Sequence, residues 1–228
     1  ISIIFQEPMT SLNPTMTVGA QVAEVLLTHK LADKKNVNDK VIDLLKKVNI
    51  PGAEDRIKNY PIQFSGGMRQ RIMIAMAIAC NPDLLIADEP TTALDVTIQA
   101  QILDLLKKIK DNTNMSILLI THDLGIVAEY SDRVIVMYAG EIFESANTIK
   151  LFKSPLHPYT QGLLNSLPKI NDSLKQLISI PGNVPTFTNL PSGCRFHPRC
   201  KYVMPICIEK HPELISVDNN HFVRCFLL

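Results

Sequence analysis

The chain has 228 residues, of which 46% are hydrophobic, and its 23 basic side chains are almost balanced by 22 acidic ones. A chain of this length can bury a substantial core in one large domain, or in one domain with a smaller appendage. Because the formal net charge is only +1, no strong electrostatic field favours nucleic acid or an anionic membrane surface as a partner. The longest apolar stretch, residues 72–80, is far shorter than the roughly 18 residues of a membrane-spanning helix.

Strand and helix patterns alternate through the first two thirds of the chain. Apolar runs predict strands over residues 1–5, 84–88 and 116–120 and a strand pair over 133–145 that turns at Ala139-Gly140. Helical spacing of apolar residues predicts helices over residues 17–30, 37–48, 68–79 and 96–110. The runs at 84–88 and 116–120 are typical of parallel strands buried on both faces. This alternation predicts an α/β domain.

The pattern loosens after about residue 146 into Pro-rich segments with short helices. Four of the five cysteines crowd into this region, at Cys194, Cys200, Cys207 and Cys225. We therefore expect one domain over residues 1–146 and a small, irregular, Cys-rich extension over 147–228.

A possible phosphate-binding element lies at Ser65-Gly66-Gly67, where a serine and two glycines open a long helix. Such a helix N-terminus presents free backbone N–H groups and a partial positive charge, which suit a phosphate. Taken alone, the tripeptide is more typical of an ordinary capped turn.

Polar side chains follow each of the three predicted parallel strands. Asp88 and Glu89 end the second strand, His122 follows the third, and Gln6 follows the first. Open α/β sheets bind ligands at the carboxyl ends of their strands. There, one carboxylate can hold Mg²⁺ while its neighbour polarises an attacking water, as in phosphoryl transfer.

Together and in this order, the motifs resemble the ATPase domain of ABC transporters over nearly the whole chain. Gln6 resembles the Q-loop glutamine, and His122 resembles the switch histidine that senses the γ-phosphate. Glu89 resembles the catalytic carboxylate. The remaining parts of the resemblance are the signature loop at 64–68, which includes Ser65, Gly66 and Gly67, Walker B at 84–88, the D-loop aspartate at Asp95, and a helical subdomain over about 10–80.

The resemblance implies an ATPase that binds ATP and Mg²⁺, with Asp88 and Gln6 as the magnesium ligands. The sequence departs from the family pattern at Met68, where many ABC proteins have glutamine, and it contains no G-x-x-x-x-G-K-[ST] motif. That motif supplies the backbone cradle and the lysine that hold the phosphates. We expect it to precede Ile1, and we expect residues 1–228 alone to hydrolyse ATP negligibly.

Two segments of the extension, 154–160 and 193–200, resemble the C-terminal extension of oligopeptide and dipeptide importer ATPases. This resemblance implies an ATP-hydrolysing subunit that drives peptide import from the cytoplasmic face of the cell membrane. The implied partners are a second, homologous ATPase subunit in a heterodimer, two membrane-spanning permeases, and an extracytoplasmic peptide-binding protein.

The four clustered cysteines suggest a metal centre. In a reducing cytoplasm, metal ligation explains clustered thiols better than disulfides do. Four thiolates suit either zinc or an iron–sulfur cluster, and resemblance to the peptide-importer extensions favours a [4Fe-4S] cluster. Four unlinked structural cysteines are the alternative.

Other functions remain open at this point. The chain could belong to an importer of nickel or another small solute in the same family, or to a soluble ABC ATPase of DNA repair or translation. It could also be a metal-binding regulatory module attached to an inactive ATPase fragment.

Overall fold

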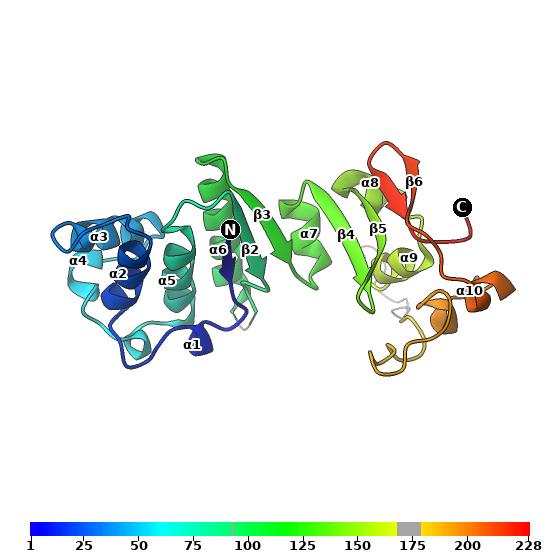
Figure 1. Ribbon diagram of the computed structural model, residues 1–228, viewed down its shortest axis with the longest axis horizontal. Helices are drawn as coiled ribbons and strands as arrows, with labels where there is room; N and C mark the ends of the chain where they lie inside the picture. The colour runs from blue at the N-terminus through cyan, green and yellow to red at the C-terminus, as the bar shows by residue number, and fades with distance from the viewer. Residues whose placement is uncertain (93, 168–178) are drawn as a thin grey trace. The chain divides into compact units, whose positions relative to one another are not determined.

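The computed structural model describes residues 1–92, 94–167 and 179–228, and these residues form two compact units. The first unit spans Ile1–His122 and the second spans Asp123–Leu228. Figure 1 shows the elements of both units in chain order. Within the described ranges, no helix combines the length and the apolar character needed to cross a membrane.

The first unit is built on a three-stranded parallel sheet with the order β1-β2-β3. The strands are β1 (Ser2–Ile4), β2 (Leu84–Asp88) and β3 (Ser116–Ile120). Asp88 at the end of β2 pairs with Ile120 at the end of β3. Because all three strands run in the same direction, the residues that follow them emerge at one edge of the sheet.

Helices pack against this sheet and form the rest of the first unit. The helical segments are α1 (Pro8–Ser11), α2 (Val18–Thr28), α3 (Val37–Lys47), α4 (Ala53–Arg56), η1 (Pro61–Gln63), α5 (Gly66–Ile78) and α6 (Val96–Asp111). Side-chain caps fix several of the starts: Thr17 accepts a hydrogen bond from the Ala20 N–H at the start of α2. The predicted helices at 17–30, 37–48, 68–79 and 96–110 are confirmed with small differences at their ends.

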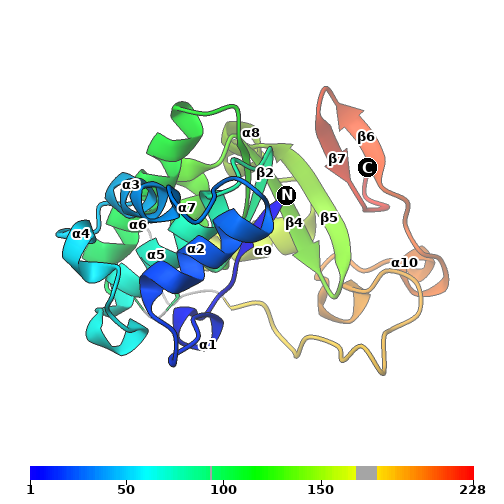
Figure 2. The ribbon, with the colours of Figure 1, turned by 60° about the vertical axis from the view of Figure 1, so that its left-hand side comes forward.

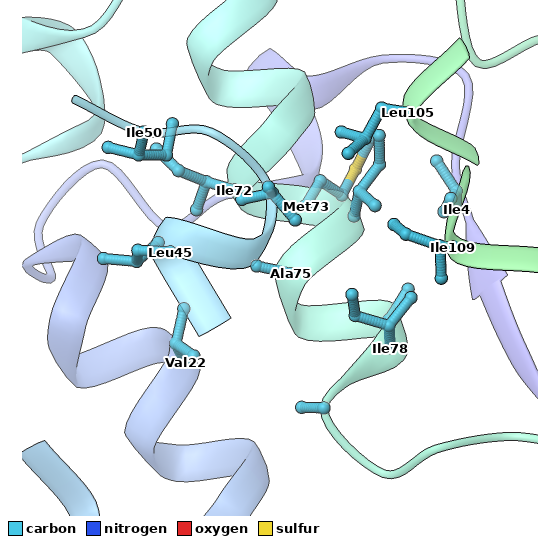
Figure 3. Close-up of a cluster of buried hydrophobic side chains, with 14 of the residues drawn as sticks. Ile4, Val22, Leu45, Ile50, Ile72, Met73, Ala75, Ile78, Leu105 and Ile109 are labelled. Atoms are coloured by element: carbon cyan, nitrogen blue, oxygen red, sulfur yellow. The ribbon is translucent and has the colours of Figure 1, made fainter. Parts of the chain in front are cut away.

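One continuous apolar core joins the helices to the sheet. Helix α5 is buried along most of its length and contacts α2, α3, α6 and β1, and Figure 1 shows it between α2–α4 and the strands. Figure 3 shows part of this core, with Val22 and Leu45 on one side of α5 and Ile4 and Ile109 on the other. Helix α5 is therefore the element through which the helical segment is attached to the sheet.

The expectation that residues 116–120 form a strand buried on both faces is wrong. Ile117 and Leu119 of β3 pack against the core, whereas Leu118 and Ile120 are each 45% exposed. Successive side chains of a strand point to opposite faces of the sheet. Among the described residues of this unit, helices cover only one of those faces. Strand β2 follows the same alternation, with Leu85 and Ala87 buried.

The second unit contains a four-stranded antiparallel sheet with the order β4-β5-β7-β6. Its elements are α7 (Leu124–Tyr130), β4 (Arg133–Tyr138), β5 (Glu141–Asn147), α8 (Thr148–Lys153), α9 (Pro158–Asn165), η2 (His197–Arg199), α10 (Pro205–Glu209), β6 (Ile215–Asp218) and β7 (His221–Val223). Ala139 and Gly140 connect β4 to β5 with φ angles of 46° and 83°. Two positive φ angles in a two-residue loop suit a tight hairpin, so the predicted turn is confirmed. Strand β7 pairs with β5 and β6 pairs with β7, and Figure 2 shows these strands.

A buried carboxylate ties the parts of the second unit together. Glu144 on β5 is fully buried and accepts hydrogen bonds from the backbone N–H groups of Leu156 (2.8 Å) and His157 (2.9 Å). Nε2 of the buried His221 on β7 lies 2.8 Å from the same carboxylate. A buried acid is tolerated only when donors compensate for its lost hydration. Glu144 therefore links β5, β7 and the start of α9.

The predicted boundary after residue 146 lies inside the second unit, within β5. The break between the two compact units instead falls between His122 and Asp123. The predicted domains, 1–146 and 147–228, were divided where the strand and helix pattern of the sequence loosens, and that division stays a prediction.

We predict that the second unit loses stability as the pH falls from about 6.5 to about 4. Burial lowers the pKa of His157 from 6.5 to about 4, against opposing effects of Glu144 and Arg224. Between these pH values the unfolded chain binds a proton that the folded chain does not. The contribution of neutral His157 to the free energy of unfolding is therefore fully present above pH 6.5, and on the order of 3 kcal/mol is lost as the pH falls to about 4. Urea unfolding across this range measures the loss.

The matched variant for this test is His157→Asn. Asparagine retains an acceptor for the Tyr159 N–H, which His157 Nδ1 binds at 3.0 Å at the start of α9, but it does not titrate. The variant is expected to be less stable at neutral pH, because it leaves a cavity, and to show a flatter pH dependence. An unchanged slope would assign the acid sensitivity to another group.

Candidate active site

Three elements of the first unit converge on the carboxylate of Glu89. Gln6, in the loop after β1, donates from Nε2 to Glu89 Oε2 at 2.8 Å. His122, after β3, places Nδ1 2.9 Å from Glu89 Oε1. Thr92 donates its hydroxyl to Oε2 at 2.8 Å. The structure thus brings together Gln6, Glu89 and His122, as expected for residues at the carboxyl ends of parallel strands.

The backbone at Glu89 explains why its side chain is held at this edge. Its N–H donates to the Ile120 carbonyl at 2.9 Å, which continues the pairing of β2 with β3 for one more residue. Its φ angle is 43°, in the left-handed region that non-glycine residues rarely adopt. Such backbone strain is often found at functional sites. The chain therefore turns sharply out of the sheet at Glu89.

The electrostatics keep Glu89 ionised while it stays accessible. Hydrogen bonds from His122 and Thr92 lower the pKa of Glu89, and the hydrogen bond from Gln6 adds a smaller effect in the same direction. The Glu89 side chain is 24% exposed and that of His122 is 78% exposed. An ionised carboxylate within reach of solvent can accept a proton from water.

The predicted phosphate-binding element lies at the start of α5. Ser65 is the N-cap and accepts a hydrogen bond from the Met68 N–H at 3.4 Å. Ser65 and Gly66 are exposed, whereas Gly67 is buried. The helix therefore presents its N-terminal end to solvent through Ser65 and Gly66, an arrangement suited to an anion. The hydrogen bonds at the Glu89 carboxylate involve none of these three residues.

The start of α5 packs closely against the start of α6. A Cβ atom added to Gly67 would lie 2.6 Å from Ile98 Cγ2, so only glycine allows this approach. Asp95 caps α6 by accepting from the Ile98 N–H at 2.9 Å. One turn further along, the Arg71 guanidinium donates to Gln101 Oε1 at 3.1 Å. These contacts fix the predicted signature loop against the helix that Asp95 begins.

The residues expected to hold Mg²⁺ have suitable chemistry. Asp88 ends β2 and Gln6 follows the neighbouring β1, so both lie at the same edge of the sheet. Magnesium is commonly held by one or two protein oxygen ligands together with the phosphates of a substrate. A carboxylate and an amide oxygen at this edge fit that coordination preference.

The four cysteines of the second unit are close enough to influence one another. Burial, with smaller contributions from Cys207, Cys225 and Cys200, raises the pKa of Cys194 to about 11. Cys194 and Cys207 lie in an apolar cluster with Phe196. In the described part of the chain, however, no three side chains of His, Cys, Asp or Glu are placed together to hold a metal ion. The expected metal centre therefore has no support in the structure, in which Cys194 and Cys207 pack as small apolar groups.

Sequence analysis missed the contribution of Thr92. The residue lies three positions after Glu89, and its N–H donates to the Glu89 carbonyl at 3.2 Å. A threonine in the turn after a strand is a common position for a hydroxyl that bonds locally. The position of Thr92 in the turn could be seen in the sequence, but only the structure shows that its hydroxyl points to the Glu89 carboxylate.

Comparison with known proteins agrees with this arrangement. The family model described as "ABC transporter" matches residues 1–92, and the model described as "Oligopeptide/dipeptide transporter, C-terminal region" matches residues 143–207. The oligopeptide transport ATP-binding protein AppD of Bacillus subtilis is 56% identical over 227 residues, covering 100% of this chain and 69% of the relative. The dipeptide transport ATP-binding protein DppD of Haemophilus influenzae is 52% identical, with 99% and 68% covered.

Solved structures share the fold at lower identity. The cbiO1 protein of Clostridium perfringens, part of the ABC transporter complex cbiONQ, is 29% identical with a TM-score of 0.59, covering 67% of this chain and 59% of that one. A dimeric ATP-binding cassette in a post-hydrolysis state, bound to ADP and Pi, is 28% identical with a TM-score of 0.55, covering 64% and 62%.

The α/β fold, the residues gathered at Glu89 and the relatives agree, and the chain belongs to the ABC transporter family of ATP-binding proteins. Within that family, its relatives are oligopeptide and dipeptide transport ATP-binding proteins, whose C-terminal region it also carries.

We predict that Gly67→Ala destabilises the chain by about 1–3 kcal/mol, because the new methyl group overlaps Ile98 Cγ2. Gly66→Ala is the matched control, since its Cβ would meet Leu94 Cδ2 at an ordinary 3.5 Å. Adding Ile98→Leu removes the Cγ2 methyl and should recover much of the loss in Gly67→Ala. Urea unfolding of the four proteins tests this packing. Equal stability of Gly67→Ala and Gly66→Ala would contradict it.

Proposed function

We propose that this protein is the ATP-hydrolysing subunit of an ABC transporter that imports peptides. The observation that carries the proposal is the Glu89 carboxylate at the end of β2, held by Gln6 and His122 from the neighbouring strands. The relatives named for oligopeptide and dipeptide transport support the choice of peptides as cargo. Nothing comparable favours nickel or another small solute.

In the proposed reaction, Glu89 accepts a proton from the water that attacks the γ-phosphorus of ATP. Hydrogen bonds orient this carboxylate, and a positioned base contributes roughly 10²- to 10⁴-fold to such a rate. Asp88 and Gln6 supply the oxygen atoms that would hold Mg²⁺, whose charge offsets that of the phosphate oxygens. His122 is exposed at the same edge, where its imidazole can contact the γ-phosphate.

The signature loop is proposed to act on a nucleotide held by a second subunit. Ser65 and Gly66 are exposed at the N-terminal end of α5, and the positive end of the helix dipole favours a phosphate there. The hydrogen bonds at the Glu89 carboxylate involve neither Ser65 nor Gly66, and we propose that the two elements serve different nucleotides. Asp95, at the start of α6, would lie at the same interface. We propose a homologous ATPase as the partner, in a heterodimer.

The remaining partners follow from this function. Two permease subunits would cross the membrane, and an extracytoplasmic binding protein would deliver the peptide. The chain would bind the permeases at the cytoplasmic face of the cell membrane. Closure around ATP would be transmitted from the loop that carries Gln6 to the permeases, and hydrolysis would reopen the dimer.

We propose, as a separate assignment, that Cys194, Cys200, Cys207 and Cys225 ligate one metal centre, a [4Fe-4S] cluster in preference to zinc. The basis of the assignment is the clustering of the four cysteines in the sequence, because four thiolates suit either centre. Cys194 and Cys207 are buried and Cys200 and Cys225 are half-buried, and burial raises the pKa of the Cys194, Cys200 and Cys225 thiols. Ligation would therefore release protons and move the side chains, and it would stabilise a unit with a small apolar core.

The first test of the ATPase is Glu89→Gln in the protein expressed with any residues encoded upstream of Ile1. Glutamine retains the shape of the side chain but cannot accept the proton, so turnover should fall roughly 10²- to 10⁴-fold while ATP binding persists. Phosphate release and nucleotide binding measure the two effects. Glu24→Gln, on the exposed side of α2, is the matched control. A parallel loss of nucleotide binding would assign Glu89 a structural role.

The metal centre is tested by anaerobic purification followed by iron, sulfide and zinc analysis. Four irons and four sulfides per chain are expected for a [4Fe-4S] cluster, and Cys194→Ser should lose them. Cys80→Ser is the control, because Cys80 lies outside the group. One zinc per chain would replace the cluster with a zinc site, and a metal-free, folded protein would reject the assignment.

A further inference from the structure

We propose that Thr92 is a positioning residue that fixes the orientation of the Glu89 carboxylate for the attack of water. The proposal rests on the ATPase function proposed above and adds a residue to it. Its basis is the hydroxyl hydrogen bond from Thr92 to Glu89 Oε2 at 2.8 Å, together with the distinct origin of that donor among the three that meet the carboxylate.

The three donors differ in how they are attached to Glu89. Gln6 is separated from Glu89 by 83 residues and His122 by 33, so each is brought to the site by another strand. Thr92 is only three residues away, and its own N–H donates to the Glu89 carbonyl at 3.2 Å. A closed local turn therefore holds the Thr92 hydroxyl close to the carboxylate.

The two distant donors have other duties in the proposed reaction. Gln6 would turn its amide oxygen toward Mg²⁺, and the exposed His122 would turn toward the γ-phosphate. Either movement would cost Glu89 a hydrogen bond. The Thr92 hydroxyl has no other role in the proposed reaction, and it moves with the segment that carries Glu89. It therefore still donates to the Glu89 carboxylate when Gln6 and His122 turn away from it.

A single persistent hydrogen-bond donor is enough to orient the Glu89 carboxylate. The φ angle of 43° at Glu89 fixes the direction in which its side chain leaves the backbone, but the side-chain torsions remain free to rotate among staggered positions. The hydrogen bond from Thr92 to Oε2 selects one of them and leaves the other lone pairs of the carboxylate available. Small errors in the position of a base lower the rate steeply, because the reacting atoms must be aligned.

The test compares Thr92→Val, which keeps the shape but removes the hydroxyl, with Thr92→Ser, which keeps the hydroxyl. In the protein expressed with any residues encoded upstream of Ile1, Thr92→Val should lower kcat about 10- to 100-fold and leave the KM for ATP unchanged. Thr92→Ser should restore most of the rate. Thr28→Val, an exposed threonine at the end of α2, should have no effect. Thr92→Ala provides a second hydroxyl deletion if valine impairs folding.

A double-mutant cycle separates this proposal from the ATPase proposal. Thr92 acts through the carboxylate, so Thr92→Val should not lower the residual rate further in a Glu89→Gln background. If Glu89→Gln itself keeps full turnover, the proposed ATPase mechanism fails. If Glu89→Gln is inactive while folded Thr92→Val and Thr92→Ala keep the wild-type kcat, the role of Thr92 is overturned and the ATPase mechanism stands. A loss that Thr92→Ser does not restore would also overturn it.

Discussion

The parallel order β1-β2-β3 is the constraint on which the candidate site depends. Three strands that run in one direction must release their chains at one edge, so residues as far as 83 positions from Glu89 meet at its carboxylate. No long loop has to be ordered to bring Gln6 and His122 there, because the pairing of the strands already fixes both starting points. The left-handed backbone at Glu89 then turns the chain out of the sheet and directs its carboxylate toward the other two residues.

Much of this arrangement could be predicted from the sequence because it depends on local signals. The apolar run at 84–88 ends in acids, Ser65 precedes two glycines and a helical pattern, and Ala139-Gly140 interrupts two strand-like runs. Each of these signals indicates an element and the residue at which it begins or ends. The pairing of the strands then brings the residues that follow them together. Resemblance to a known family supplied the roles of the residues, which periodicity alone could not.

The features that escaped prediction depend on contacts between distant parts of the chain. Whether a face of β3 is covered depends on helices elsewhere, so the apolar residues Leu118 and Ile120 gave no sign of their exposure. The pairing of β7 with β5 joins strands far apart in sequence. Clustered cysteines in a sequence indicate proximity, but not whether the thiols point together, and the described residues hold no ready metal site. In the sequence, Glu144 is typical of an exposed residue of a hairpin. Its burial is explained by its contacts with Leu156, His157 and His221, which the sequence does not indicate.

The bond between Glu144 and His221 has a consequence for how the protein is made. The two residues are 77 positions apart, and β5 lacks its second neighbour until β7 has been synthesised. The first unit has all three of its strands by residue 120, so it can assemble while the rest of the chain is still on the ribosome. During that interval the nascent hairpin of β4 and β5 carries an unpaired edge, and Glu144 lacks its contact with His221. Premature termination of translation before His221 would therefore release a chain whose second unit has an open, aggregation-prone strand edge.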